Sequence, residues 1–155
     1  MKLFCSFLIS CIAFIGNSQI RIDDVGDGWK AQVEQALQVV QQTDCEKYEM
    51  IVSTCTHISY STANFATTES GNTILIPRRE IMAGNINDIA AILVHESLHL
   101  YILQTKMLMP EADEELLCYA YELEFLLQIP EVEPWLLDHA RKQIAYFSSK
   151  SVGSN

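Results

Sequence analysis

The sequence predicts a single α+β domain at residues 19–147. The chain has 155 residues, enough for one domain with one hydrophobic core. Four stretches show the apolar spacing or the unbroken apolar character of helices. Two shorter stretches are rich in β-branched and aromatic residues, which favour strands. We therefore expect a small antiparallel sheet packed on a layer of helices.

The first 18 residues are predicted to be a signal peptide. Lys2 provides a short positive start, and Leu3–Ile15 is apolar but too short to span a membrane. Small and polar residues at Gly16–Ser18 then indicate cleavage after Ser18. The alternatives are a lipoprotein anchor at Cys11, whose following residues are apolar rather than a polar tether, and a retained N-terminal anchor. The leader predicts a secreted or periplasmic protein without a stable membrane span.

The net charge excludes some classes of partner, and the cysteines allow a prediction of disulfide bonds. Loss of Lys2 with the leader changes the formal net charge from −10 to −11. Nucleic acid phosphates and anionic lipid headgroups would repel such a chain, so we expect neither as a partner. Cys45 and Cys55 are predicted to form a disulfide in an oxidising compartment, and Cys118 to be a buried free thiol.

The segment before the central helix is predicted to hold one helix and both strands. Apolar residues recur every three to four positions in Trp29–Thr43, which predicts a helix. Tyr48–Ser61 alternates and is rich in β-branched residues, and Asn72–Pro77 repeats that composition, so both are predicted strands. The Thr, Ser and Gly residues of Ala63–Asn72 indicate a loop between them.

The stretch Asn87–Gln104 is aliphatic, contains no Pro or Gly, and is predicted to be a helix that ends near Lys106. It contains the pattern HExxH, formed by His95, Glu96 and His99. Residues four apart on a helix share a face, so the two imidazoles point the same way and can bind one zinc ion. Glu96 lies beside them, where its carboxylate can take a proton from water at the metal.

Two more helices are predicted after this one. Pro110 is well placed to open a helix over Glu111–Gln128, which Pro130 ends. A last helix is predicted over Trp135–Phe147. The Ser- and Gly-rich tail Ser148–Asn155 is predicted to be disordered.

The HExxH helix and, more weakly, the helix after it resemble the zincin superfamily of zinc metallopeptidases. The resemblance implies that His95 and His99 bind zinc, that Glu96 is the general base, and that the substrate is a peptide. It also implies a rim strand along the cleft, for which Thr73–Ile76 is the candidate. The chain departs from the zincin pattern at Ser97, where zincins usually have a bulky apolar residue.

The class of zincin follows from the third zinc ligand. The metzincin pattern needs Gly and His where this chain has Ile102 and Thr105, so it is excluded. The gluzincin pattern takes a Glu from a following helix, and Glu114 and Glu115 lie fifteen and sixteen residues beyond His99. That gap allows a turn and an antiparallel return, so the expected fold is a minimal gluzincin.

The face of the second helix favours Glu115 over Glu114. At about 100° per residue, Glu115 lies on the border of the predicted core stripe beside Leu126, whereas Glu114 points away from it. Cys118 also places a small residue three positions after Glu115, a spacing that gluzincin ligand helices often show. Glu114 is expected in a solvated acidic first turn. The predicted core stripe consists of Leu116, Tyr119, Ala120, Leu123 and Leu127.

The expected activity is hydrolysis of peptide bonds with one zinc ion per chain. His95, His99 and Glu115 are the expected metal ligands, and Glu96 the catalytic residue. Two other functions are kept open: a zinc-binding protein that cleaves nothing, and a secreted interaction module whose HExxH is accidental. The group that stabilises the oxyanion is left open among Tyr101, Tyr119, Tyr121 and His139.

Overall fold

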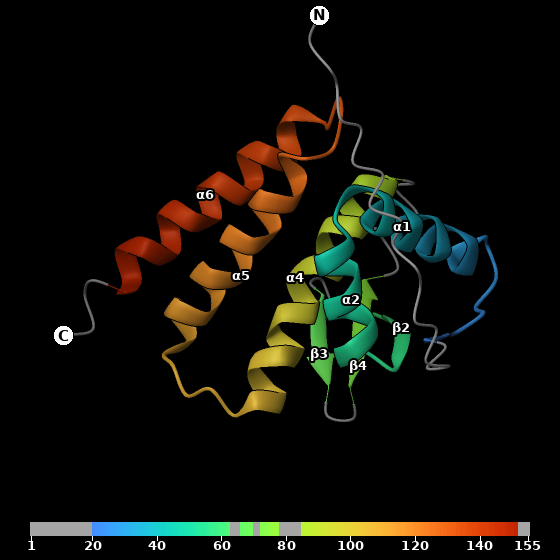
Figure 1. The fold of residues 1–155 in the computed structure, drawn as a ribbon, viewed down its shortest axis with the longest axis horizontal. Coiled ribbons are helices and arrows are strands. Elements are labelled where there is room, and N and C mark those ends of the chain that lie inside the picture. The colour runs from blue at the N-terminus through green and yellow to red at the C-terminus, as the bar shows by residue number, and fades with distance from the viewer. Residues whose placement is uncertain (1–19, 63–65, 70–71, 78–84, 152–155) are drawn as a thin grey trace, which may run out of the picture.

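The computed structural model describes residues 20–62, 66–69, 72–77 and 85–151. The predicted leader, the alternative anchor at Cys11 and residues 152–155 of the predicted tail lie outside these ranges. The described part contains five helices and a small four-stranded sheet (Figure 1). The helices are α1 (Trp29–Thr43), α2 (Cys45–Thr54), α4 (Ile86–Thr105), α5 (Glu111–Leu126) and α6 (Pro134–Ser151). The strands are β1 (Arg21–Ile22), β2 (His57–Ser61), β3 (Thr67–Glu69) and β4 (Thr73–Pro77).

The α+β class is confirmed, but the sheet is mixed rather than antiparallel. Its order is β1-β2-β4-β3, and β2 pairs with β4 in parallel. Only β3 runs antiparallel to β4. β3 lies within Ala63–Asn72, which was predicted to be a loop. The strand was missed because its polar sequence Thr-Thr-Glu has no alternation of apolar residues. Once β3 forms the hairpin with β4, β2 is left on the other side of β4.

The predicted strand Tyr48–Ser61 is half wrong, since α2 occupies Cys45–Thr54 and β2 begins only at His57. The Asp44 side chain caps α2 by accepting a hydrogen bond from the backbone N–H of Lys47 at 3.1 Å. Lys47, Ile51 and Thr54 are buried, at the spacing of one helical face. The cap and this face outweigh the strand preference of the β-branched residues.

Helix α4 is the centre of the fold and contacts α1, α2, α5, β3 and β4. Asn85 caps the helix, because its side chain accepts a hydrogen bond from the backbone N–H of Asp88 at 3.0 Å. The helix ends at Thr105, and Lys106 adopts the left-handed conformation that closes it. By length and composition α4 could cross a membrane, but most of it is buried within the fold, as is typical of a core helix.

Helices α5 and α6 form a hairpin on the side of α4 opposite α1 and α2 (Figure 1). The buried face of α5 consists of Cys118, Glu122, Phe125 and Leu126, so the predicted core stripe is rotated from the real one. Helix α6 extends to Ser151, four residues beyond its predicted end, into the predicted disordered tail. The carboxylate of Glu133, just before α6, accepts hydrogen bonds from the Asn85 and Asn87 side chains, which holds the hairpin against the start of α4.

The predicted Cys45–Cys55 disulfide is wrong, because neither cysteine is part of a disulfide. Cys45 is the first residue of α2, and Cys55 follows its last residue. A helix of ten residues is about 15 Å long, whereas disulfide-bonded Cα atoms lie within about 7 Å. The prediction of Cys118 as a buried free thiol is confirmed.

Lys47 is a buried cation that connects α2 to α5. Its ammonium group lies 2.8 Å from Glu124 Oε2 and 3.5 Å from the centroid of the Tyr121 ring. Only 4 % of the residue is exposed. Lys47→Met keeps the apolar stem but loses the charged hydrogen bond and the cation–π contact. We expect it to lower the free energy of unfolding by about 1–3 kcal/mol in urea titrations.

Lys30→Met is the matched control for this prediction. Lys30 lies 3.9 Å from Glu34 in an exposed i,i+4 pair, so its loss should change the free energy of unfolding by less than about 0.5 kcal/mol. Equal effects of the two substitutions would show that the buried contacts of Lys47 add nothing to the docking of α5.

Candidate metal centre

Helix α4 brings the two histidines of the HExxH pattern together, as predicted. The Nε2 atoms of His95 and His99 lie 3.2 Å apart, and the ring centroids 5.0 Å apart. His95 is 7 % exposed and His99 is partly buried. The paired rings therefore lie largely out of contact with solvent, with one nitrogen of each turned to the other.

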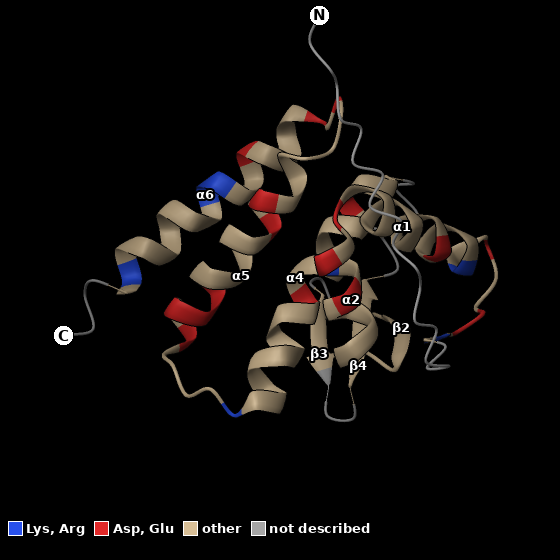
Figure 2. Ribbon diagram, viewed as in Figure 1, with Lys and Arg blue, Asp and Glu red and all other residues tan. Residues whose placement is uncertain are grey.

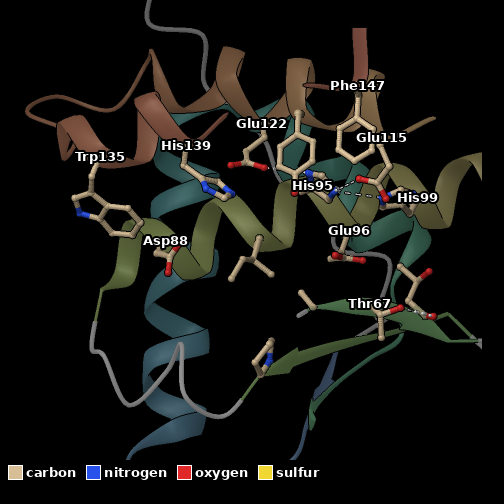
Figure 3. A pocket seen from close by; sticks show the side chains of 15 residues that line it. Thr67, Asp88, His95, Glu96, His99, Glu115, Glu122, Trp135, His139 and Phe147 are labelled. Carbon is tan, nitrogen blue, oxygen red and sulfur yellow. Dashed lines mark hydrogen bonds and ion pairs between the residues drawn. The ribbon is translucent and has the colours of Figure 1, made fainter. Parts of the chain in front are cut away.

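Helix α5 returns alongside α4 and adds Glu115 to this pair. Its Oε2 lies 3.6 Å from His95 Nε2, and its Oε1 lies 3.5 Å from His99 Nε2. In Figure 3, His95, His99 and Glu115 point toward one another. The structure thus brings together the three residues that the sequence favoured as ligands.

Two further carboxylates contact the opposite nitrogens of the same rings. His99 Nδ1 donates a hydrogen bond to Glu114 Oε1 at 2.7 Å, and His95 Nδ1 donates to Glu122 Oε2 at 3.0 Å. The expectation of a solvated Glu114 is therefore wrong, because its side chain is only 29 % exposed and is bound to His99. Sequence reasoning missed Glu122, although it lies seven residues after Glu115, two helical turns along the same face.

The charges around the rings set the protonation of the site. Burial alone would lower the pKa of His95, but the carboxylates of Glu115 and Glu122 outweigh burial and raise the pKa to about 9. Contact with His95 lowers the pKa of Glu115. Positive charge between the rings is thus strongly favoured.

The spacing of the donor atoms fits a metal ion. Since the carboxylates accept hydrogen bonds from both Nδ1 atoms, the lone pairs of the neutral rings lie on the two Nε2 atoms. The two Nε2 atoms lie 3.2 Å apart, a separation that a shared proton or a metal ion between them accounts for. Two ligands about 2.0–2.1 Å from a tetrahedral zinc ion lie about 3.3 Å apart. The histidine pair can hold a metal ion.

Cys118 is a further donor close to this pair. Its Sγ lies within 4.8 Å of a nitrogen of each ring, so His95, His99 and Cys118 form a group that could hold a metal ion. The thiol is fully buried against Leu98 and Ile102, and burial raises its pKa. A thiol must lose its proton to bind a metal ion, so Cys118 would be a ligand only as the thiolate.

The histidines line one wall of a cleft of about 600 Å³ between α4, the α5–α6 hairpin and the sheet (Figure 3). Glu96 points into this cleft from the side of α4 that faces β3. The residue is 6 % exposed, and burial raises the pKa of its carboxyl group. A buried carboxylate that opens only to the cleft is placed to exchange a proton with a molecule bound there.

The strand at the edge of the cleft is β3, not the predicted Thr73–Ile76. That segment lies in β4, which has paired neighbours on both sides and offers no free edge. β3 is the edge strand, and Ala66, Thr67 and Thr68 line the cleft. The sequence prediction failed because it did not contain β3.

Two of the four candidate oxyanion donors line the cleft, namely Tyr119 and His139. The Tyr119 ring packs edge-on against His95, with centroids 4.4 Å apart. Tyr101 is not among the lining residues, and Tyr121 instead contacts Lys47.

Ser97, the departure from the zincin pattern, turns away from the cleft. It is fully buried, and its hydroxyl donates to the backbone carbonyl of Val94 at 2.8 Å. The serine is therefore accommodated in the core and leaves the cleft unchanged.

Acidic residues outnumber Lys and Arg among the described residues, and the first turn of α5 carries several of the acidic ones (Figure 2). No Lys or Arg is among the described residues that line the cleft. Comparisons of the chain with protein-family models, with curated proteins and with solved structures find no match, so the geometry of the site is the basis for assigning a function.

Proposed function

We propose that this chain is a zinc-dependent metallopeptidase of the gluzincin type. One observation carries the proposal: His95 Nε2, His99 Nε2 and the Glu115 carboxylate converge within 3.2–3.6 Å on the wall of a cleft that also holds buried Glu96. Three protein ligands with a free fourth position are typical of catalytic zinc. Two imidazoles and one carboxylate form a donor set that zinc prefers over calcium or magnesium.

The proposed reaction is hydrolysis of a peptide bond. Bound zinc would supply Lewis acidity, which polarises the substrate carbonyl and lowers the pKa of water. Glu96 Oε would take the proton of the attacking water and then pass it to the leaving amine. Its raised pKa suits both steps, because a general base works best when its pKa approaches the working pH.

Tyr119 is the proposed donor to the oxyanion. It lines the cleft, and its ring contacts His95, so the side chain belongs to the same wall as the metal ligands. Burial raises the pKa of this hydroxyl, which keeps it protonated and able to donate. His139, on α6, also lies against the Tyr119 ring, with ring centroids 6.1 Å apart.

The proposed substrate is an unstructured peptide or protein segment bound in extended form. β3, beside Glu96, is the outermost of the described strands on its side of the sheet, and this supports the proposal because an edge strand offers backbone hydrogen bonds to an added strand. We also propose that the protein is exported by the leader at residues 1–18 and works outside the cytoplasm, with anchoring at Cys11 as the alternative.

Cys118 favours a second candidate, a zinc-binding protein that cleaves nothing. If its thiolate were the fourth ligand, the site would be closed, and closed sites are structural. Cobalt in place of zinc separates the candidates, because a thiolate ligand produces a sulfur-to-cobalt charge-transfer band that Cys118→Ser would abolish.

The direct test is elemental analysis of the purified protein together with a cleavage assay on a library of unstructured peptides. We expect one zinc per chain and cleavage that a chelator abolishes and added zinc restores. Zinc without cleavage would support the non-catalytic candidate. Absence of zinc binding under any condition would contradict both and leave the interaction module, with an accidental HExxH.

A further inference from the structure

Resting on the proposed function, we infer that Glu114 and Glu122 are positioning residues that orient the zinc-binding histidines. From sequence, Glu114 was the alternative to Glu115 as third ligand, and Glu122 was not considered. Each accepts a hydrogen bond from one ring nitrogen, Glu114 from His99 at 2.7 Å and Glu122 from His95 at 3.0 Å. Neither carboxylate lies on the Nε2 side of the rings that Glu115 occupies.

These contacts fix the tautomer of each ring. An ionised carboxylate only accepts hydrogen bonds, so each Nδ1 must carry the hydrogen. The lone pair of a neutral imidazole is then on Nε2, the atom that faces the other ring. Without the carboxylates, each ring could place its hydrogen on Nε2 and turn a donor toward the metal.

The burial of Glu122 supports this role over a purely structural one. Only 9 % of its side chain is exposed, and His95 is the partner that the structure shows for it among the described residues. A buried carboxylate with no Lys or Arg partner is costly, and an apolar residue would fill this position in the α4–α5 interface at lower cost. Glu114 is 29 % exposed at the side chain, so water can replace part of its contact.

The three glutamates share one helix. Glu115 and Glu122 lie two turns apart on α5, and Glu114 is adjacent to Glu115. Docking of α5 on α4 therefore delivers the third ligand and both positioning carboxylates in one step. The Lys47 contact with Glu124 fixes the same helix from the side of α2.

The test compares zinc affinities, measured by competition with a chromophoric chelator. Glu122→Leu removes the acceptor and is expected to weaken zinc binding about 10- to 100-fold. Glu122→Gln keeps an acceptor oxygen, so it should recover a large part of that loss. Glu114→Leu should weaken binding less than Glu122→Leu, because its site is more exposed. Glu111→Gln, in the exposed first turn of the same helix, is the matched control and should change nothing.

Nitrogen-detected NMR of the zinc-free proteins, at a pH where both rings are neutral, provides a readout that a structural role would not move. The parent should show both histidines with hydrogen on Nδ1, Glu122→Gln should keep this pattern, and Glu122→Leu should shift His95 toward the form with hydrogen on Nε2. Should Glu122→Leu fail to fold, Glu114→Leu and Glu122→Gln still decide the matter. Zinc binding by the parent with equal affinity in all variants would overturn the inference alone. A parent that binds no zinc would overturn the proposed function and the inference with it.

Discussion

His95→Ala is expected to bind no stoichiometric zinc and to lose the thermal stability that zinc gives the parent. Bound zinc would join α4 to α5, through His95 and His99 on one helix and Glu115 on the other. A ligand that binds only the folded state at about 1,000 times its dissociation constant stabilises that state by about 4 kcal/mol. Removing one of three ligands should abolish this gain. Elemental analysis and thermal unfolding, with zinc or with chelator, measure both effects.

His139→Ala is the control for this experiment. His139 lines the same cleft from α6 but contacts neither of the paired histidines in the ring contacts that the structure records. It should retain one zinc per chain and the zinc-dependent rise in melting temperature. Equal zinc content in the parent and His95→Ala would show that the paired histidines are not the metal site. Equal loss in both variants would contradict the assignment of His139 as a bystander, because zinc binding would then require His139 as well.

The part of the site that the sequence predicted depends on local geometry alone. His95 and His99 share a face because four residues separate them on any helix, and nothing in α4 interrupts that helix. Glu115 was favoured over Glu114 because it shares a face with Cys118 and Leu126. Both of these are buried in α5, so these two residues indicated the inner face even though the predicted core stripe did not.

The features that the sequence did not predict depend on contacts between distant segments of the chain. Glu122 is on the buried face because α5 docks against α4, and a charged residue gives no sign of burial in the sequence. β3 is a strand because it pairs with β4 beside the cleft, while its own residues are polar. Cys45–Thr54 is a helix because Asp44 caps it and Lys47 binds Glu124, seventy-seven residues away. Composition alone gave the opposite prediction for α2.

Glu96→Gln is expected to retain zinc and the fold while losing nearly all peptide hydrolysis. Glutamine has almost the shape of glutamate but cannot accept the proton of the attacking water. Removal of a general base typically costs about 10²- to 10⁴-fold in rate. Zinc should remain, because the proposed ligands are His95, His99 and Glu115. The fold should remain as well, since burial already penalises the charged form of Glu96 and glutamine carries no charge.

Initial rates on an unstructured peptide, measured at equal zinc content, check this prediction. Glu111→Gln again serves as the control, because it removes one exposed carboxylate from α5 and should cleave at the parent's rate. A Glu96→Gln variant that cleaves as fast as the parent would exclude Glu96 as the base and with it the proposed mechanism. A parent that holds zinc but cleaves nothing across a broad peptide library would instead make the chain a zinc-binding protein. Buried Glu96 would then have no part in catalysis and would only add negative charge beside the zinc-binding histidines.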